Sequence, residues 1–445
     1  MHPFHHPSTA PDRAHALIRF TSDDFRLAAE EALGAAYRGA ADVGEVLATV
    51  ARIPDGDADA WLREWCDVAG AVWTAARDAD AAEHRASALT HYRRAATYYA
   101  AALALVAHSG EPEREAPLWR RQRACWDRVV ALSPAPGERV AIPYEDVTLP
   151  AWFFPAPDAV PGERRPLVVL NNGSDGATSQ LWVHGGAAAA ERGYHWMTFD
   201  GPGQQAALME QGLPFRPDWE AVLTPVVDAM VARPDVDALR LAVVGIGQGG
   251  FWVPRALAFE HRFAAAVADP GVVDVSASWL DALSAPLREH LERGERAAFD
   301  REMHLAELFS ARTRTTLDFR GRPYGVAGDS RFALYEAVRA YRLGDEARDI
   351  RTPLLVTAPA DERFWPGQAQ QLYDRLPGDG HALAPFGAAE GAARHGEPVG
   401  AALRETRVFD WLDGHLSPSP TSIPLSGTDV GLGAEGAGDP GLGDG

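Results

Sequence analysis

The sequence predicts an α/β protein whose doubly wound, mostly parallel sheet follows an all-helical domain. Three observations lead to this prediction. Residues 14–135 carry apolar side chains at three- and four-residue spacing, the period of a helix. From residue 136 to 416, short apolar runs alternate with helical segments, as in parallel strands joined by crossover helices. Residues 278–348 interrupt that alternation with charged amphipathic helices, which we interpret as a cap inserted between two strands.

Composition limits the classes of function. A chain of 445 residues with 46% hydrophobic and 23% charged residues is typical of a soluble protein of two or three domains. A formal net charge of −20 argues against nucleic acid or an anionic membrane surface as a partner. All 42 basic residues are arginine, which excludes a Schiff-base, pyridoxal-phosphate, P-loop or kinase lysine. We therefore expect no cofactor, and no His, Asp or Glu cluster has the spacing of a metal site.

The two ends of the chain differ in composition from the rest. Residues 1–13 are polar, and residues 417–445 are rich first in Ser and Pro and then in Gly and Asp, so we expect both to be disordered. The N-terminus shows no secretion signal, and the longest apolar run, residues 95–107, is too short to span a bilayer. These features predict a cytoplasmic protein that has no membrane contact.

The individual elements follow from local patterns. Segments such as DDFRLAAEEALGAAYRG (residues 23–39) predict amphipathic helices, and the run from Pro134 to Gly137 ends the helical part. Strands are expected at the apolar or β-branched runs, and a helical segment follows NNGSDG through Ala190. The expected strands are 140–143, 147–154, 165–170, 194–199, a strand from Leu241, one in AAAVADPGVVD, 353–357 and a weak one at 381–385. Helices are expected at 219–231 and 402–415.

The stretch LAVVGIGQGG, Leu241 to Gly250, dominates the second half of the chain. A β-branched run ends in a glycine-rich turn, and a helical pattern follows at once. This is the strand–turn–helix form of a nucleophile elbow, G-x-S-x-G, in which the central serine attacks the substrate. Gly245 and Gly249 occupy the small-residue positions, but the central position is Gly247. Glycine tolerates the strained backbone of that turn, so the fold should survive the loss of serine.

Residues 139–415 resemble an α/β-hydrolase catalytic domain. The elbow, FDGPGQ, DERFWPGQ and EGAARHGEP carry the resemblance together. With the helical region in front, they resemble the subgroup that contains the fermentation–respiration switch protein and the 2,6-dihydroxypseudooxynicotine hydrolase, and peptidase-like hydrolases with the same pattern. The resemblance implies a triad in the chain order nucleophile, acid, histidine. Here that order gives Gly247 at the nucleophile position, then Asp361 or Glu362, then His395.

The resemblance also assigns roles to these residues. His395 would be the general base, oriented by one carboxylate, and Glu362 is preferred to Asp361 because it stands four residues before a proline, a spacing common in the family. The oxyanion hole would use the backbone N–H of Gln248 and that of Ser174 or Asp175. Both donors are main-chain groups, so they do not depend on a serine at position 247.

Three functions remain open from the sequence. The first is a hydrolase of small organic esters, amides or C–C bonds, weakened or inactive because Gly247 replaces the nucleophile. The second is a non-catalytic protein that binds a small molecule. The third is a non-hydrolytic enzyme, such as an epimerase, lyase or cyclase, with His395 as a proton shuttle. In each case we expect the ligand to be a small molecule enclosed by the cap and the helical domain. The helical domain is also a candidate contact for a homodimer.

Overall fold

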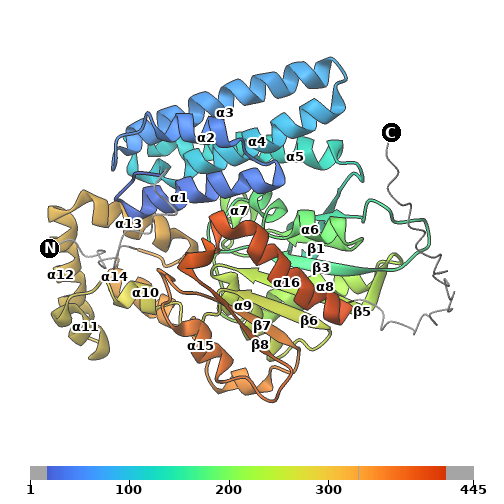
Figure 1. The fold of residues 1–445 in the computed structure, drawn as a ribbon. Helices are drawn as coiled ribbons and strands as arrows, with labels where there is room; N and C mark the ends of the chain where they lie inside the picture. The colour runs from blue at the N-terminus through green and yellow to red at the C-terminus, as the bar shows by residue number, and fades with distance from the viewer. Residues whose placement is uncertain (1–17, 329, 417–445) are drawn as a thin grey trace, which may run out of the picture.

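The structure is a computed structural model that describes residues 18–328 and 330–416 (Figure 1). The two ends that we expected to be disordered, 1–13 and 417–445, lie outside the described residues. A helical region comes first. Its helices are α1 (Asp23–Gly34), α2 (Val43–Val50), α3 (Ala58–Ala81), α4 (Arg85–Ala104) and α5 (Glu115–Leu132), with 3₁₀ turns η2 (Ala35–Arg38), η3 (Val106–His108) and η4 (Pro112–Arg114).

Local chemistry fixes the helical region. The carboxylates of Asp42 and Asp57 each accept a backbone N–H and so cap the first turns of α2 and α3. Trp61, Trp65 and Tyr98 are fully buried between α3 and α4, with neighbouring rings 5.6 and 5.7 Å apart. Within the described residues, no helix is long and apolar enough to cross a membrane.

The sheet is mixed and mostly parallel. Its strands are β1 (Glu138–Tyr144), β2 (Val147–Phe154), β3 (Arg165–Asn171), β4 (His195–Phe199), β5 (Val236–Ile246), β6 (Ala265–Asp269), β7 (Leu354–Pro359) and β8 (Ala382–Phe386). They lie in the order β1-β2-β4-β3-β5-β6-β7-β8; β1 and β2 pair antiparallel, and the pairs from β4 to β8 are parallel. The predicted fold class is confirmed.

Helices cover both faces of the sheet, as the alternation along β3 requires. Leu167 and Val169 enter a core shared with α8 (Glu220–Val231), α9 (Gly249–Leu257) and the cap. Val168 and Leu170 enter the opposite core, which includes the helical region, α6 (Gly186–Glu191) and α16 (Ala401–Leu416). Two short helices, α7 (Gln205–Met209) and α15 (Gln368–Tyr373), and the 3₁₀ turns η8 (Ala388–Glu390) and η9 (Pro398–Gly400) complete this part.

Two elements differ from the sequence prediction. Strand β5 begins at Val236, five positions before Leu241, and its first half is partly exposed, so the apolar pattern does not reveal it. The segment after NNGSDG is not one helix but the 3₁₀ turn η5 (Thr178–Trp182) followed by α6. Gly185 lies between η5 and α6, and its φ of +148° breaks the helical backbone there.

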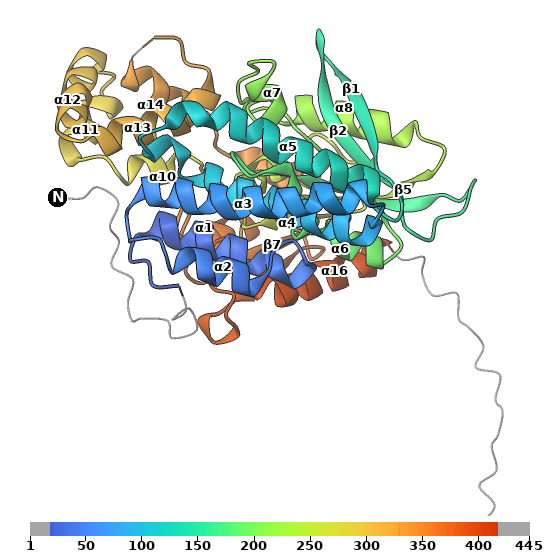
Figure 2. The same cartoon turned by 90° about the horizontal axis from the view of Figure 1, so that it is seen from above.

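The cap lies between β6 and β7, where the sequence predicts it. It comprises α10 (Ala277–Leu280), α11 (Ala285–Glu292), α12 (Arg296–Phe309), α13 (Ala311–Gly321), η6 (Arg322–Tyr324), α14 (Arg331–Arg339) and η7 (Asp345–Asp349). Both views place α13 beside the helical region (Figures 1 and 2). Arg312 binds Asp24 of α1, and Arg322 binds Glu115 of α5. The cap and the helical region are therefore joined by ion pairs.

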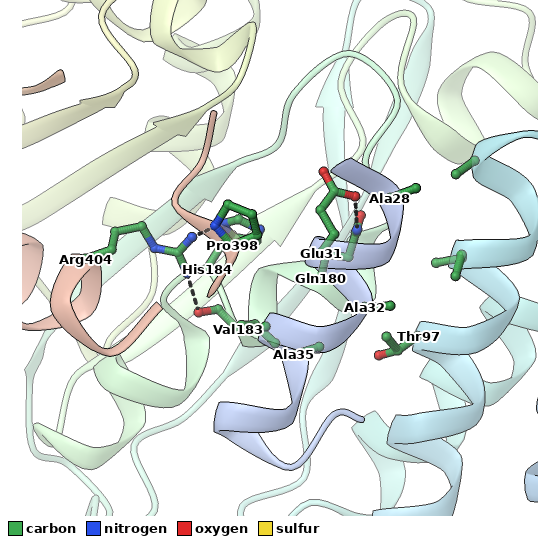
Figure 3. A pocket seen from close by; sticks show the side chains of 14 residues that line it. Ala28, Glu31, Ala32, Ala35, Thr97, Gln180, Val183, His184, Pro398 and Arg404 are labelled. Atoms are coloured by element: carbon green, nitrogen blue, oxygen red, sulfur yellow. Dashed lines mark hydrogen bonds between the residues drawn. The ribbon is translucent and has the colours of Figure 1, made fainter. Parts of the chain in front are cut away.

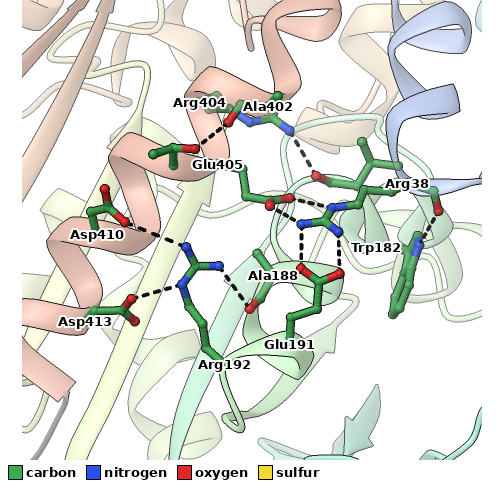
Figure 4. A network of polar contacts seen from close by, with 12 residues as sticks. Arg38, Trp182, Ala188, Glu191, Arg192, Ala402, Arg404, Glu405, Asp410 and Asp413 are labelled. Carbon is green, nitrogen blue, oxygen red and sulfur yellow. Dashed lines mark hydrogen bonds and ion pairs between the residues drawn. The ribbon is translucent and has the colours of Figure 1, made fainter. Parts of the chain in front are cut away.

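On the other side, the helical region is anchored by Arg38 at the end of η2. Its guanidinium binds the carboxylates of Glu405 on α16 and Glu191 on α6 (Figure 4). The backbone oxygen of Arg38 also accepts the indole N–H of Trp182 at 3.0 Å. Arg38 and Glu405 are nearly buried, with 13% and 7% of their side chains exposed. This pair fixes the helical region to the sheet domain.

Candidate active site

The nucleophile-elbow turn is present between β5 and α9. Gly247 has φ +59°, the left-handed conformation that this turn requires, and its N–H donates to the Asp269 carbonyl at 2.7 Å. A Cβ on Gly245 would lie 2.2 Å from the Gly249 carbonyl oxygen, and one on Gly250 would lie 1.8 Å from that of Pro270. Glycines at these two positions are therefore required by close backbone packing.

At Gly247, unlike at Gly245 and Gly250, there is room for a Cβ atom. A Cβ built there would meet Nε2 of His395 at 3.6 Å and the Cα of Gly173 at 3.7 Å, which are ordinary van der Waals separations. A side chain at this position would thus point at the imidazole of His395 without a clash. A serine hydroxyl there would come within hydrogen-bonding reach of Nε2, the geometry of a nucleophile and its base.

His395 is held from its other ring nitrogen by Glu362. Nδ1 lies 2.9 Å from Oε2 and 3.1 Å from Oε1 of the carboxylate. Oε1 also accepts the backbone N–H of Phe364 at 2.8 Å, which fixes the carboxylate in place. The other candidate acid, Asp361, is exposed, and its backbone pairs with the His395 loop through an N–H bond to Ala393. The structure therefore brings Glu362, and not the side chain of Asp361, to the histidine.

The Glu362–His395 pair favours its charged form. Burial alone would lower the pKa of His395, but the adjacent Glu362 carboxylate raises it above its ordinary value. Burial would raise the pKa of Glu362, yet His395 and the backbone N–H donors hold it below its ordinary value. Phe364 lies edge-on to the imidazole, with ring centroids 4.9 Å apart. His395 keeps only 16% of its side chain exposed. The imidazole is therefore oriented, shielded and made more basic.

The predicted oxyanion donors lie beside the elbow. A Cβ on Gly173 would be 3.6 Å from the backbone nitrogen of Gln248, so the loop after β3 packs directly against the turn. The N–H of Gly173 is bound by the Asn172 side chain at 2.9 Å. Within the described residues, the backbone N–H groups of Gln248 and Ser174 donate no hydrogen bond. Unused N–H groups at a sheet edge can stabilise a developing oxyanion.

Asp175, the other candidate for the second oxyanion donor, also affects the pKa of a buried carboxyl group. Its carboxylate contributes to raising the pKa of Glu31, a residue of α1 that the sequence analysis did not single out. Burial is the larger cause, and together they bring the pKa of Glu31 to about 7, although His395 opposes the shift. Gln180 Nε2 lies 3.4 Å from Glu31 Oε2. The helical region thus places a titrating carboxyl near the catalytic loops.

Helix α1 is fixed against these loops. Arg363, next to Glu362, binds Asp24 at 2.6 Å, and Arg394, next to His395, lies 3.5 Å from Glu30. Glu31 also lines a cleft between α1, α4, the end of η5 and the start of α16 (Figure 3). A helix in the N-terminal third of the chain, with a regular amphipathic pattern, gives no sequence signal for such a contact.

A second buried acid escaped the sequence analysis although it stands in the motif EGAARHGEP. Glu397 is fully buried with φ +43°, and burial raises its pKa well above the ordinary value. The neighbouring carboxylate of Asp269 raises the pKa of Glu397 further. Asp269 accepts the Thr357 hydroxyl at 2.8 Å and, through its carbonyl, the Gly247 N–H. The pair lies directly behind the elbow.

Other polar and aromatic residues in or near these motifs have structural roles. Asp200 of DGPGQQ is buried and binds Arg123 and Thr178, at 2.6 and 2.9 Å, so it ties its loop to α5 and η5. His381 accepts, through Nδ1, the backbone N–H of Leu354, the first residue of β7. Trp252 stacks on Trp219 inside the core. Among the described residues, no group of three or more His, Cys, Asp and Glu side chains is arranged to hold a metal ion.

Comparisons with known proteins bear on the family and the fold of the chain. Residues 223–316 match the prolyl oligopeptidase family. The chain is 34% identical over 263 residues to the 20-hydroxy-prefusarin hydrolase of Gibberella moniliformis, a match that spans 58% of this chain and 62% of that relative's length. The 2,6-dihydroxy-pseudo-oxynicotine hydrolase has the same fold, with a TM-score of 0.65 at 18% identity, over 86% of this chain and 95% of that one.

One relative decides the family. The α/β hydrolase psoB of Aspergillus fumigatus is 31% identical over 360 residues, which cover 77% of this chain and 80% of that protein. Sequence, sheet order and the elbow all lead to the same result. The chain belongs to the α/β-hydrolase family.

Proposed function

We propose that this protein descends from a serine hydrolase of small organic esters, amides or C–C bonds, and that Gly247 leaves it weak or inactive in that reaction. The observation that carries the proposal is the position of Gly247. Its backbone has the elbow conformation, and a Cβ there would point at Nε2 of His395 from 3.6 Å. The base, the acid Glu362 and the backbone donors remain around a missing hydroxyl.

The chemistry that remains is limited. Without a hydroxyl at position 247, no acyl-enzyme forms, and the oxyanion donors and substrate binding alone retain about 10³–10⁴-fold enhancement over water in such sites. His395 can still activate a water molecule in the space beside Gly247. Direct hydrolysis by this route is expected to be slow because the water is not covalently fixed.

The retained acid–base pair also supports a second candidate, a non-hydrolytic reaction in which His395 moves a proton. Glu362 holds the imidazole at 2.9 Å, and Glu31, with a pKa of about 7, is a further group able to give or take a proton near neutral pH. An epimerase, lyase or cyclase needs such groups but no nucleophile. A non-catalytic binding protein has no need for either, so it ranks behind both.

The test compares the protein as it is with Gly247→Ser and Gly247→Ala. Both variants add the same Cβ and the same backbone strain, so the alanine variant isolates the hydroxyl. We expect the serine variant to react with a fluorophosphonate probe and to hydrolyse p-nitrophenyl esters at least ~100-fold faster than the alanine variant. His395→Ala should abolish that gain.

Each other outcome has a defined meaning. If the serine variant folds but neither labels nor hydrolyses, the catalytic interpretation of Gly247, Glu362 and His395 is wrong. If the unmodified protein converts a substrate without hydrolysing it and loses that turnover in His395→Ala, the reaction is non-hydrolytic and needs no serine. The second candidate then replaces the first.

A further inference from the structure

Arg320, near the end of cap helix α13, differs from the other arginines of the cap. Most cap arginines have a carboxylate within 4 Å. Within the described residues, Arg301, Arg314 and Arg320 have none; Arg301 and Arg314 are exposed, so water solvates their charge. Arg320 is partly buried, and burial lowers the pKa of its guanidinium. A partly buried cation that has no carboxylate within 4 Å gains from an anion that joins it.

The surroundings of Arg320 are aromatic and neutral. The guanidinium carbon lies 4.7 Å from the ring centroid of Trp279, and Nη2 is 3.5 Å from the Ser278 hydroxyl. Trp279 in turn packs edge-on against Tyr324 and Tyr335, with centroids 5.6 and 5.8 Å apart. All three rings are almost fully buried, whereas Arg320 keeps accessible surface. The cation is thus held on an aromatic wall with one side open.

Tyr324 links this wall to the elbow. The side chain of Gln248, the residue after Gly247, lies close enough to the Tyr324 hydroxyl to affect its pKa. Gln248 is only 5% exposed, and its Nε2 is buried without a hydrogen-bond acceptor among the described residues. An amide N–H₂ has two hydrogens, so even beside the Tyr324 hydroxyl it keeps a hydrogen that it can donate to a ligand. It is independent of Arg320.

The catalytic loops complete the surroundings. Asp175 of the oxyanion loop and Arg363 of the acid loop both lie near enough to Arg320 to shift its pKa, in opposite directions. Asp175 already places one negative charge near Arg320, so a dianion such as phosphate would be repelled more strongly than a monoanion. A single negative charge of carboxylate type, attached to an apolar body, fits one guanidinium, one amide and the aromatic wall.

We propose that Arg320 and the Gln248 side chain form a subsite for a carboxylate-type monoanion on the substrate or ligand, beside the aromatic wall of Trp279 and Tyr324. The proposal rests on the proposed function and deepens it, because Gln248 directly follows Gly247 in the elbow turn. Binding energy from the anion would orient the reacting bond at the elbow. The family fold alone does not require it, since Arg320 belongs to the inserted cap.

The first test is binding, and it uses the protein as it is. Isothermal titration calorimetry with 4-phenylbutyrate and with the uncharged 4-phenylbutanamide compares two ligands of the same shape. We expect the carboxylate to bind at least about 10-fold more tightly. Arg320→Gln should weaken carboxylate binding about 10- to 100-fold and leave the amide unchanged, and Arg320→Lys should fall between them. Arg314→Gln, an exposed position on the same helix, is the matched control and should change nothing.

Three results would overturn the subsite. These are equal affinity for the two ligands, no detectable carboxylate binding up to about 10 mM, and an equal loss of both ligands in Arg320→Gln. A purely structural role would show as a lower melting temperature of Arg320→Gln. The subsite predicts an unchanged or higher one, because an uncompensated charge is removed.

A kinetic arm separates this proposal from the proposed function. In the Gly247→Ser background, mono-p-nitrophenyl glutarate carries the anion and p-nitrophenyl pentanoate does not. Arg320→Gln should reduce kcat/KM about 10- to 100-fold for the glutarate alone. If the serine variant hydrolyses neither ester while calorimetry still shows the carboxylate preference, the proposed function fails and the subsite stands. If both esters are hydrolysed equally well with and without Arg320, the subsite fails and the hydrolase stands.

Discussion

A Cβ on Gly247 would lie 3.6 Å from Nε2 of His395, and no backbone atom blocks it. The two neighbouring elbow glycines have no such room, since a Cβ on Gly250 would meet a carbonyl oxygen at 1.8 Å. Among the glycines of this turn, position 247 is therefore the one with room for a Cβ, and its side chain would face the base. Packing explains Gly245 and Gly250, whereas the absence of a hydroxyl at position 247 has no packing reason.

The first prediction concerns the stability cost of a side chain at position 247. Gly247→Ser and Gly247→Ala should each lower the free energy of unfolding by about 1–2 kcal/mol, because both place a Cβ in the left-handed region at φ +59°. Urea unfolding measures this change. Gly245→Ala is the contrast: its Cβ would meet the Gly249 carbonyl at 2.2 Å, so it should cost clearly more. Equal costs at the two positions would contradict the open space at Gly247.

The second prediction concerns pH and the Glu362–His395 pair. In the Gly247→Ser variant, kcat/KM should rise with pH through the pKa of His395, since the neutral imidazole is the base. After the opposing effect of burial, the Glu362 carboxylate keeps that pKa above 6.5. Glu362→Gln should move this limb to lower pH and reduce kcat about 10³–10⁴-fold, as loss of the orienting acid does in other triads.

Asp361→Asn is the matched control for Glu362→Gln, because the Asp361 side chain is exposed. It should leave both the pH profile and kcat within about 2-fold. A large loss of kcat in Asp361→Asn together with a small loss in Glu362→Gln would show that Asp361, and not Glu362, is the acid that orients His395. NMR titration of the His395 ring in both variants checks the pKa directly.

The third prediction concerns Glu31. Burial and Asp175 raise its pKa to about 7, so the folded state holds a proton that the unfolded chain releases above about 4.5. Stability should therefore fall as pH rises from 4.5 to 7, and Glu31→Gln removes this loss. Relative to the parent, Glu31→Gln should gain roughly 2–3 kcal/mol between pH 4.5 and pH 8, measured by urea unfolding at each pH.

Glu64 offers a control with the opposite sign. Hydrogen bonding from Arg52 lowers the pKa of Glu64, so its contribution is complete above about 4.5 and does not change toward pH 8. Glu64→Gln should therefore show a flat difference from the parent between pH 5 and pH 8. A flat difference for Glu31→Gln as well would show that Glu31 titrates normally.

Local patterns predicted most of this fold because its strands are short, apolar and bounded by turn residues. Strand β5 shows the limit: its first half is partly exposed and interrupted by Asp237 and Arg240, so only the part from Leu241 has a clear signal. The residues of the candidate site divide in the same way between those with a local sequence signal and those without one. The elbow, Glu362 and His395 stand in motifs, but Glu31 and Arg320 reach the site through packing of the helical region and the cap. Long-range packing of this kind leaves no periodic trace in a single sequence.

The last prediction concerns the contact between the helical region and the sheet domain. Arg38 is nearly buried and joins Glu405 and Glu191, so Arg38→Ala should leave the buried Glu405 carboxylate without its partner. We expect a loss of about 3–5 kcal/mol in the free energy of unfolding. Arg52→Ala, which removes a half-exposed pair with Glu64, should cost less than about 1 kcal/mol. Equal, small losses in both variants would mean that apolar packing alone holds the helical region, and limited proteolysis of Arg38→Ala would then release no helical fragment.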